Sequence, residues 1–203
     1  MVDYVYYKNP VVVKVEPTSG FAEGGTPIEV TGAWFNLQPS HGIIPMCRFG
    51  EKIVRARYDS TVRIVCNTPP SDNILTPVPV HVSLNGVDWV DSGSKYSYYV
   101  QAEIKGIEPK IGAVNSGTLI FVKGKNFSNI TDSEMSKCQW TLIENVMGET
   151  RPQFLTQYTP ATYHNGTHMV CLTPGHFIGG DRAYVQLTFN NLDYSEQSED
   201  LIF

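Results

Sequence analysis

The fold is decided by residues 15–35, near the start of the chain, which read VEPTSGFAEGGTPIEVTGAWF. The stretch recurs 92 residues later (107 minus 15) as IEPKIGAVNSGTLIFVKGKNF over residues 107–127. In both copies a Glu-Pro pair opens a turn, a Gly-Thr pair precedes alternating apolar residues, and a glycine stands three residues before a phenylalanine. A fixed offset of this kind marks an internal repeat. The chain is therefore expected to fold as two copies of one unit.

The cysteines extend the repeat and show that its second copy is longer. Cys47 matches Cys138 at an offset of 91, and Cys66 matches Cys171 at an offset of 105. The second copy thus carries 14 added residues between its cysteines (105 minus 91). We place this insertion at around residues 145–168.

The offsets also predict the domain boundaries. We expect a first domain over residues 10–100 and a second over residues 101–203. The tyrosines of residues 4–7 repeat at residues 96–99, so residues 1–9 are expected to be the last strand of a preceding repeat or an N-terminal extension. The sequence is then a piece of a longer array.

Composition and patterning predict an all-β protein. The 203 residues are 41% hydrophobic and include 17 Gly, 13 Pro and 11 Tyr, which is typical of short strands joined by many turns. Ile28 and Val30 alternate with Glu29 and Thr31, and Asn85-Gly86 is a strong hairpin signal. About seven short strands fit each copy. That number is typical of an immunoglobulin-like sandwich.

The motifs of the first copy resemble those of the IPT/TIG domain, an immunoglobulin-like module of surface receptors. They are Glu16-Pro17-Thr18-Ser19-Gly20, Gly24-Gly25-Thr26, Gly32-Ala33-Trp34-Phe35, Cys47-Arg48-Phe49-Gly50, Cys66-Asn67-Thr68-Pro69-Pro70 and Tyr96-Ser97-Tyr98-Tyr99. The second copy departs from the pattern, with Asn115-Ser116 before Gly117 and Gly175 in place of the second proline. The resemblance implies two tandem IPT/TIG sandwiches that act as rigid, non-enzymatic modules for spacing, adhesion or partner binding.

The four cysteines predict two disulfides, one in each copy. Four cysteines allow three pairings. The repeat favours Cys47 with Cys66 and Cys138 with Cys171, on strands that face one core. The alternative is four buried free thiols in a cytosolic protein.

Three Asn-x-Ser/Thr motifs lie in the second copy and are candidates for N-glycosylation. They begin at Asn126, Asn129 and Asn165. Asn126 and Asn129 are too close together for both to carry a glycan. Asn165 falls within the predicted insertion and is expected in an exposed loop. Together with the paired cysteines, the motifs favour a secretory route.

Two surfaces are candidate binding sites. One is a set of basic residues on neighbouring strands that would suit an acidic partner or an anionic glycan, namely Arg48, Arg55, Arg57 and Arg63. Its alternative is an ordinary solvated strand face. The other lies in the inserted loop, where binding often resides on a rigid sandwich, and includes Tyr163, His164 and His168. Its alternative is a longer hairpin without a partner.

Other chemistry finds little support in the residues. The spacing of His164, His168 and Cys171 superficially resembles a metal site, but Cys171 has a disulfide partner by the repeat. We find no catalytic, phosphate-binding or calcium-binding motif, so we predict no enzyme activity, no metal and no cofactor. The net charge of −5 argues against nucleic-acid binding. No apolar run is long enough for a membrane helix, so we expect no direct membrane insertion of this fragment.

The leading hypothesis is therefore a pair of extracellular repeat modules in a large cell-surface or secreted protein. Their partners would be neighbouring repeats of the same chain and another protein or a glycan. One alternative is a set of intracellular repeats in a filament-associated cytoskeletal protein, with reduced cysteines and bare asparagines. Another is an accessory module that binds carbohydrate through Trp34 or Trp89. A DNA-binding module is disfavoured by the acidic balance.

Overall fold

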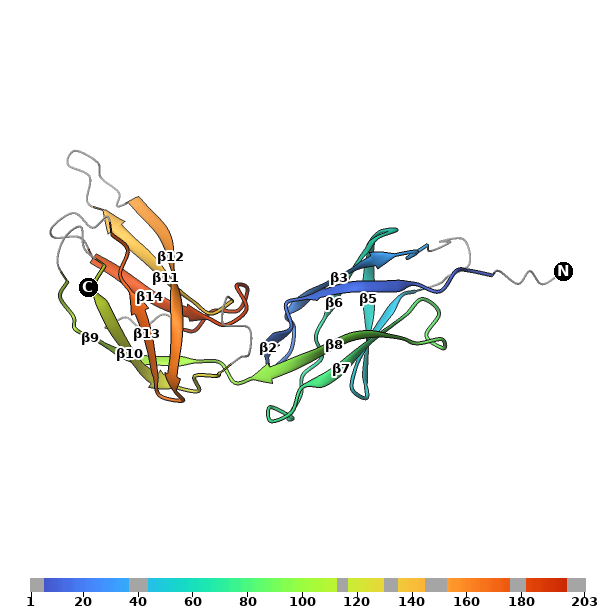
Figure 1. Ribbon diagram of the computed structural model, residues 1–203, viewed down its shortest axis with the longest axis horizontal. Helices are drawn as coiled ribbons and strands as arrows, with labels where there is room; N and C mark the ends of the chain where they lie inside the picture. Colours follow the sequence, from blue (N-terminus) through green and yellow to red (C-terminus); the bar gives the residue numbers. More distant parts are fainter. Residues whose placement is uncertain are drawn as a thin grey trace. The chain divides into compact units, whose positions relative to one another are not determined.

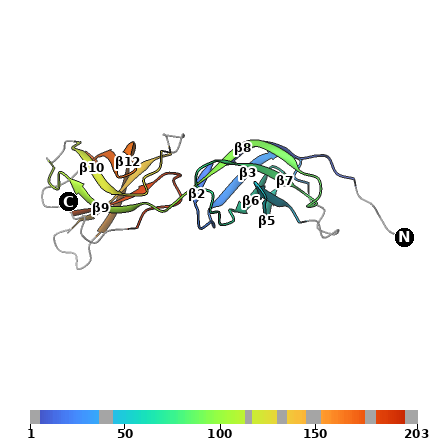
Figure 2. The same ribbon diagram turned by 90° about the horizontal axis from the view of Figure 1, so that it is seen from below.

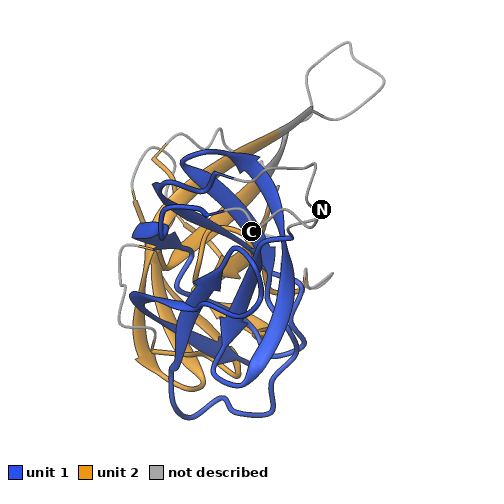
Figure 3. Ribbon diagram, turned by 90° about the vertical axis from the view of Figure 1, so that its right-hand side faces the viewer, with its two compact units in different colours: residues 1–99 blue, residues 100–203 orange. Residues whose placement is uncertain are grey.

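The computed structural model describes residues 6–36, 44–112, 117–129, 135–144, 153–175 and 182–196. The chain divides into two compact units, Met1–Tyr99 (unit 1) and Val100–Phe203 (unit 2), which Figure 3 shows in blue and orange. All regular structure in the described residues is β-strand, which confirms the all-β prediction. Within this part of the chain, no helix has the length and apolarity that a membrane span requires.

Unit 1 is an eight-stranded sandwich in the hydrogen-bonded order β1-β3-β6-β5-β4-β7-β8-β2 (Figure 1). All neighbours are antiparallel except β2 and β8, which are parallel. The strands are β1 (Val11–Glu16), β2 (Ser19–Phe21), β3 (Pro27–Ala33), β4 (Met46–Phe49), β5 (Lys52–Ser60), β6 (Arg63–Asn67), β7 (Val78–Ser83) and β8 (Val90–Tyr99).

Unit 2 repeats this arrangement with six described strands in the order β14-β11-β12-β13-β10-β9. Figure 2 shows each unit from a second direction, with its strands wrapped around one interior. The strands are β9 (Glu103–Glu108), β10 (Leu119–Lys125), β11 (Lys137–Glu144), β12 (Gln153–Asn165), β13 (His168–Leu172) and β14 (Arg182–Thr188).

In each unit one strand belongs to both sheets of the sandwich. This crossing strand is β5 in unit 1 and β12 in unit 2. In β5, Val54 pairs with Cys47 of β4, and two residues later Ala56 pairs with Cys66 of β6. In β12, Thr159 pairs with Cys138 and Ala161 pairs with Cys171. Both cysteines of a unit therefore lie beside the crossing strand, one on each side of it.

The two cores follow from the period of two along each strand. In β3, Ile28 and Val30 are fully buried while Glu29 between them is exposed. The largest side chains below 2% exposure are Tyr96, Phe35, Ile28, Ile64 and Leu84 in unit 1, and Trp140, Phe189, Ile120, Met169 and Leu187 in unit 2. Each unit thus has a core of its own, as a domain of this size requires.

The turn after β7 has an equivalent after β14, built in the same way. Asn85 accepts hydrogen bonds on Oδ1 from the backbone N–H of Val87 and of Asp88, and its Nδ2 donates to the Asp88 carboxylate over 2.8 Å. In the same way, Asn190 accepts hydrogen bonds on Oδ1 from the backbone N–H of residues 192 and 193, and its Nδ2 donates to the Asp193 carboxylate over 2.8 Å. An asparagine that mimics a backbone turn explains why this residue recurs.

The structure moves the predicted insertion. Cys47 pairs with Val54 of β5, which lies 7 positions later in the chain (54 minus 47). Cys138 pairs with Thr159 of β12, which lies 21 positions later (159 minus 138). The difference of 14 accounts for the whole insertion. All added residues therefore belong to the β11–β12 hairpin, and the predicted range 145–168 extends too far toward the C-terminus. Residues 145–152, between the two strands of this hairpin, lie outside the described residues.

The described part of the N-terminal segment, residues 6–10, forms no strand. The Tyr7 hydroxyl lies 3.2 Å from the Asp88 carboxylate, and the Lys8 ammonium lies 3.4 Å from the centre of the Trp34 ring. This segment therefore packs on unit 1. Its assignment to a preceding repeat stays a prediction, because residues 1–5 lie outside the described residues.

Candidate functional site

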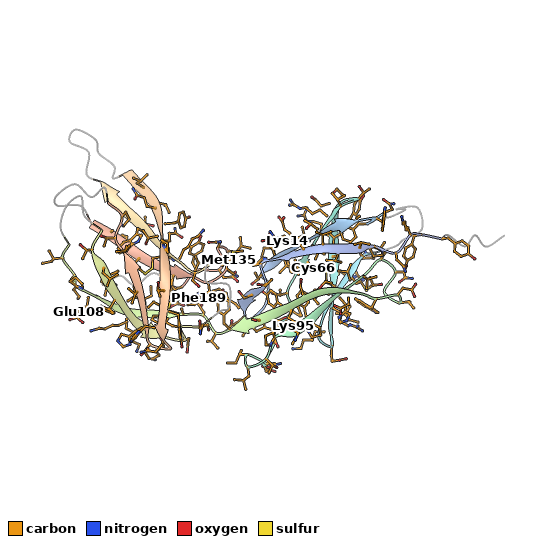
Figure 4. The ribbon with its side chains drawn as sticks, viewed as in Figure 1. Lys14, Cys66, Lys95, Glu108, Met135 and Phe189 are labelled. Carbon is orange, nitrogen blue, oxygen red and sulfur yellow. A yellow bond between two sulfur atoms is a disulfide. The ribbon has the colours of Figure 1, made fainter. Side chains whose placement is uncertain are left out.

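Each unit contains one disulfide, between the cysteines that the repeat pairs. Cys47 is bonded to Cys66 with Cα atoms 6.4 Å apart, and Cys138 to Cys171 with Cα atoms 6.3 Å apart. All four side chains are buried, and Figure 4 shows Cys66 inside unit 1. The chain has no free cysteine. Each bond joins the two strands that flank the crossing strand and so ties the two sheets together.

The predicted arginine face lies on the outer side of unit 1, but most of its charges already have partners. Arg63 lies 2.9 Å from the Glu29 carboxylate and 3.2 Å from that of Asp59. Arg57 lies 3.6 Å from the same Asp59. These exposed ion pairs, worth about 0–1 kcal/mol each, neutralise much of the basic charge on β5 and β6.

The other two arginines lie on the β4 side of the crossing strand. The Arg48 guanidinium stacks 4.8 Å from the centre of the Trp89 ring, and its Nε is buried without a hydrogen-bond partner among the described residues. Arg55, paired in register with Met46, is exposed on the outer side of β5. Of the four, Arg55 is thus the most available to an anion. The ring of Trp89, like that of Trp34, carries a cation on one side.

Part of the equivalent face in unit 2 is apolar. On the sheet of β9, β10, β13 and β12, Leu119 lies opposite Leu172, and Phe121 opposite Val170. The corresponding pairs in unit 1 place Pro27 opposite Asn67 and Glu29 opposite Val65. The repeat offsets of 92 and 105 show these exchanges, so the sequence holds the signal. We did not predict the face because the pairing register is needed to bring its residues together.

The second outer face also differs in charge. In unit 1 one row across β5, β4 and β7 consists of Ile53, Arg48 and His81. In unit 2 the equivalent row across β12, β11 and β14 is Tyr158, Gln139 and Gln186. Gln186 Nε2 donates to the Ser195 carbonyl over 2.8 Å. Burial and a hydrogen bond with Tyr158 raise the pKa of Tyr194 to about 12.

The predicted binding loop proves to be a turn that both units share. Its residues Tyr163, His164 and His168 flank Gly166-Thr167, which follows β12, and the same turn in unit 1 holds Thr61-Val62 after β5. Tyr163 lies opposite buried Met169, whereas its neighbour His164 is exposed on the other side of the strand. The structure therefore does not gather the three side chains into one site.

The glycosylation candidates lie at one end of unit 2. The backbone N–H of Phe127, which follows Asn126, donates to the Gly166 carbonyl, next to Asn165. Both asparagines and Asn129 are exposed. Asn126 adopts a left-handed backbone (φ 58°), and its Nδ2 donates to the carbonyl of Gln101 over 3.1 Å.

Within the described residues, no group of three or more His, Cys, Asp or Glu side chains is placed to hold a metal ion. Of the three residues with metal-like spacing in the sequence, Cys171 is in a disulfide and His168 contacts Asn165.

The comparison with known families agrees with this architecture. The profile of the IPT/TIG domain matches residues 10–98 and, a second time, residues 102–201. The chain belongs to the IPT/TIG domain family. Its second match covers the copy whose motifs depart from the pattern, so those departures do not remove unit 2 from the family.

Several known proteins are similar to the chain. Human fibrocystin-L is 28% identical over 180 residues, which are 87% of this chain and 4% of that protein. Human plexin-A2 is 30% identical over 126 residues, 62% of this chain and 6% of that protein. The solved full extracellular region of plexin A4 covers 98% of this chain at a TM-score of 0.50 and 20% identity, with 16% of that structure matched, which supports the fold. The chain thus spans less than a tenth of the length of its curated relatives.

Proposed function

We propose that the chain is a pair of non-catalytic IPT/TIG modules from the extracellular region of a large cell-surface protein, where they space and present recognition surfaces. The observation that carries the proposal is the pair of buried disulfides at equivalent positions of two units. Structural disulfides persist in oxidising compartments and are rare in the cytosol. The similarity to plexins and fibrocystin-L supports the same location.

A spacing role is supported by the short connection between the units. Strand β8 ends at Tyr99 and β9 begins at Glu103, so three residues, 100–102, join them. The Gln101 side chain donates to the Tyr194 carbonyl, and the Gln101 carbonyl accepts from Asn126, both over 3.1 Å. Ala102 is only 3% exposed. Residues 101 and 102 thus pack within unit 2, and the connection lacks the Gly/Ser composition of flexible linkers.

A recognition role is supported by the outer faces. The outer side of β5 in unit 1 would bind an acidic partner or an anionic glycan, with Arg55 at its centre and Arg48, Arg57 and Arg63 around it. The turn that holds His164 and His168 offers a smaller second contact in unit 2. Rigid sandwiches commonly bind through such faces and turns.

Location is tested by peptide mapping of the protein from its natural source under non-reducing conditions. We expect the peptides of Cys47 and Cys66 to remain linked, as well as those of Cys138 and Cys171. Antibody staining of intact cells should detect the full-length protein without permeabilisation. Free thiols at all four cysteines and staining only after permeabilisation would favour the filament-associated alternative.

The arginine face is tested with heparin as a model anionic glycan. We expect Arg55→Glu to elute from a heparin column at a lower salt concentration than Lys95→Glu. The second variant changes the net charge equally, at an exposed position of β8. Equal elution of the two variants would show that general charge, and not the face around Arg55, governs binding.

A further inference from the structure

The outer face of the β9–β10–β13–β12 sheet carries an apolar stripe, which we define as Leu119, Phe121, Val170 and Leu172. Leu119 is 52% exposed, Leu172 47% and Phe121 41%. They form two adjacent rows, since Leu119 lies opposite Leu172 and Phe121 opposite Val170. Contiguous exposed apolar side chains are often a site of interaction.

The fold itself does not require the stripe. Unit 1 has the same sheet with the same register, and there Glu29 takes the place of Phe121 and bonds to Arg63. The stripe is therefore particular to unit 2. Its cover must be sought among features that unit 2 has and unit 1 lacks.

Asn165 is such a feature and lies on the same face. It pairs with His168, which pairs in turn with Lys123 of β10. Asn165 Oδ1 lies 3.2 Å from His168 Nδ1, and His168 points outward because the next residue, Met169, is fully buried. The row of Phe121 and Val170 is two residues farther along these strands, which is about 7 Å.

The Asn165 amide is also oriented by its own turn. Its Oδ1 accepts from the Thr167 N–H over 2.9 Å and from the Thr167 hydroxyl over 2.8 Å. The amide nitrogen Nδ2 makes no hydrogen bond within the described residues, and the side chain is exposed. By contrast, Nδ2 of Asn126 is bonded to the Gln101 carbonyl.

We propose that Asn165 carries an N-linked glycan and that its first sugars lie over the apolar stripe; this rests on the proposed function, because the secretory route attaches such glycans. The bond from Nδ2 to C1 of the first N-acetylglucosamine forms as the C1–O bond to a lipid pyrophosphate donor breaks, and one amide proton is released. The sugar's C–H faces and acetyl methyl group pack on Phe121 and Val170, while its hydroxyls remain in water. No partner protein is then needed to keep the stripe from water.

The experiment uses the two-unit protein secreted from cultured animal cells. Site occupancy is read by enzymatic deglycosylation in ¹⁸O-labelled water followed by peptide mapping. We expect conversion of Asn165 to labelled aspartate. Asn165→Gln should raise the fluorescence of a dye that binds exposed apolar surface severalfold. The control Asn129→Gln, which removes another motif of unit 2 at an exposed position, should leave it unchanged.

Further variants separate loss of the glycan from loss of the fold. Thr167→Ala removes the motif and should repeat the effect of Asn165→Gln, whereas Thr167→Ser keeps the motif and should not. Adding Phe121→Glu to Asn165→Gln should return dye binding to the wild-type level, because it restores the residue that unit 1 has at this position.

Three results would overturn the proposal. The first is unmodified Asn165 in a secreted, disulfide-bonded protein. The second is unchanged dye binding after the glycan is lost. The third is a dimer of the glycosylated protein that Phe121→Glu dissociates, which would make a second copy the cover. A protein that is retained in cells with free thiols would instead contradict the proposed extracellular location.

Discussion

Units 1 and 2 are built on the same plan, each with its own core, disulfide and asparagine turn, yet parts of their outer faces differ in chemistry. Unit 1 presents the ion pair of Glu29 with Arg63, whereas unit 2 has Phe121 and His168 at the equivalent positions. Core positions must fill one interior, so they vary little between copies of a fold. Outer positions face no such demand. The two units therefore differ mainly on their outer faces, which contact solvent or other molecules.

A second difference lies in the hairpin that holds the insertion. Strand β4 has four residues where β11 has eight, and β5 has nine where β12 has thirteen. At the base of the longer hairpin, Trp140 takes the core position that Phe49 has in unit 1 (140 minus 91). The Trp140 indole N–H donates to the Thr159 hydroxyl over 2.8 Å, a bond that phenylalanine cannot make.

The largest effect is expected from emptying this core position. Trp140→Ala should lower the free energy of unfolding of unit 2 by about 3–5 kcal/mol, because a fully buried aromatic side chain is lost. Hydrogen exchange read by mass spectrometry should show faster exchange in unit 2 and unchanged exchange in unit 1. Phe49→Ala is the matched variant and should do the reverse. Faster exchange in both units from either variant would contradict separate cores.

Removing a disulfide should have the next largest effect. The bond between Cys47 and Cys66 spans 19 residues, and paired alanine substitutions should cost unit 1 about 3 kcal/mol in the chain-entropy account. The bond between Cys138 and Cys171 spans 33 residues, so its loss should cost unit 2 slightly more. Chemical denaturation with and without reductant measures both. A loss that reductant reproduces only in part would point to packing of the sulfurs as a separate contribution.

The exposed ion pair should contribute much less. A double-mutant cycle of Glu29→Ala and Arg63→Ala should give a coupling of about 0.2–1 kcal/mol that weakens as salt is added. The matched cycle in unit 2, Phe121→Ala with His168→Ala, should show no such salt dependence at neutral pH. Salt-independent coupling between Glu29 and Arg63 would show that packing, and not charge, joins them.

The smallest effect concerns an acidic side chain at the exposed edge of unit 2. A hydrogen bond from Lys123, together with its charge, lowers the pKa of Glu108, which Figure 4 labels. A lowered folded-state pKa stabilises the fold above the unfolded-state pKa, and this contribution is lost as the pH falls through the folded-state value. A carboxyl NMR titration should show the Glu108 pKa rising in Lys123→Ala. Lys125→Ala is the control, since Lys125 pairs with Glu103, and an equal rise there would contradict the assignment.

Local signals in the sequence predicted the parts that repeat. Asn85 and Asn190 fall at one offset because the same side-chain hydrogen bonds build both turns. The cysteine pairs are predictable because each copy supplies one pair. The position of the insertion could not be predicted in this way, because the offsets count 14 added residues but do not place them between particular strands. The strand register between Cys138 and Thr159 was needed to assign them to one hairpin.

The candidate surfaces were less predictable than the fold. Four arginines close together in sequence suggested one basic face, but Asp59 and Glu29 neutralise part of it. Glu29 lies far from the arginines in sequence, and only the pairing of β3 with β6 brings it next to Arg63. The apolar stripe of unit 2 could not be predicted for the same reason, because only the pairing of β10 with β13 brings its residues together.

By itself, the sequence determined the repeat, the all-β class, the cysteine pairs and the side of the strand on which most residues lie. Alternation has a period of two, and turn residues act over three or four positions, so these features are local. Only the tertiary structure decided which residues share a face, because long-range backbone hydrogen bonds set the register between strands. Leu119 and Leu172 are 53 residues apart (172 minus 119) and become neighbours only when β10 pairs with β13.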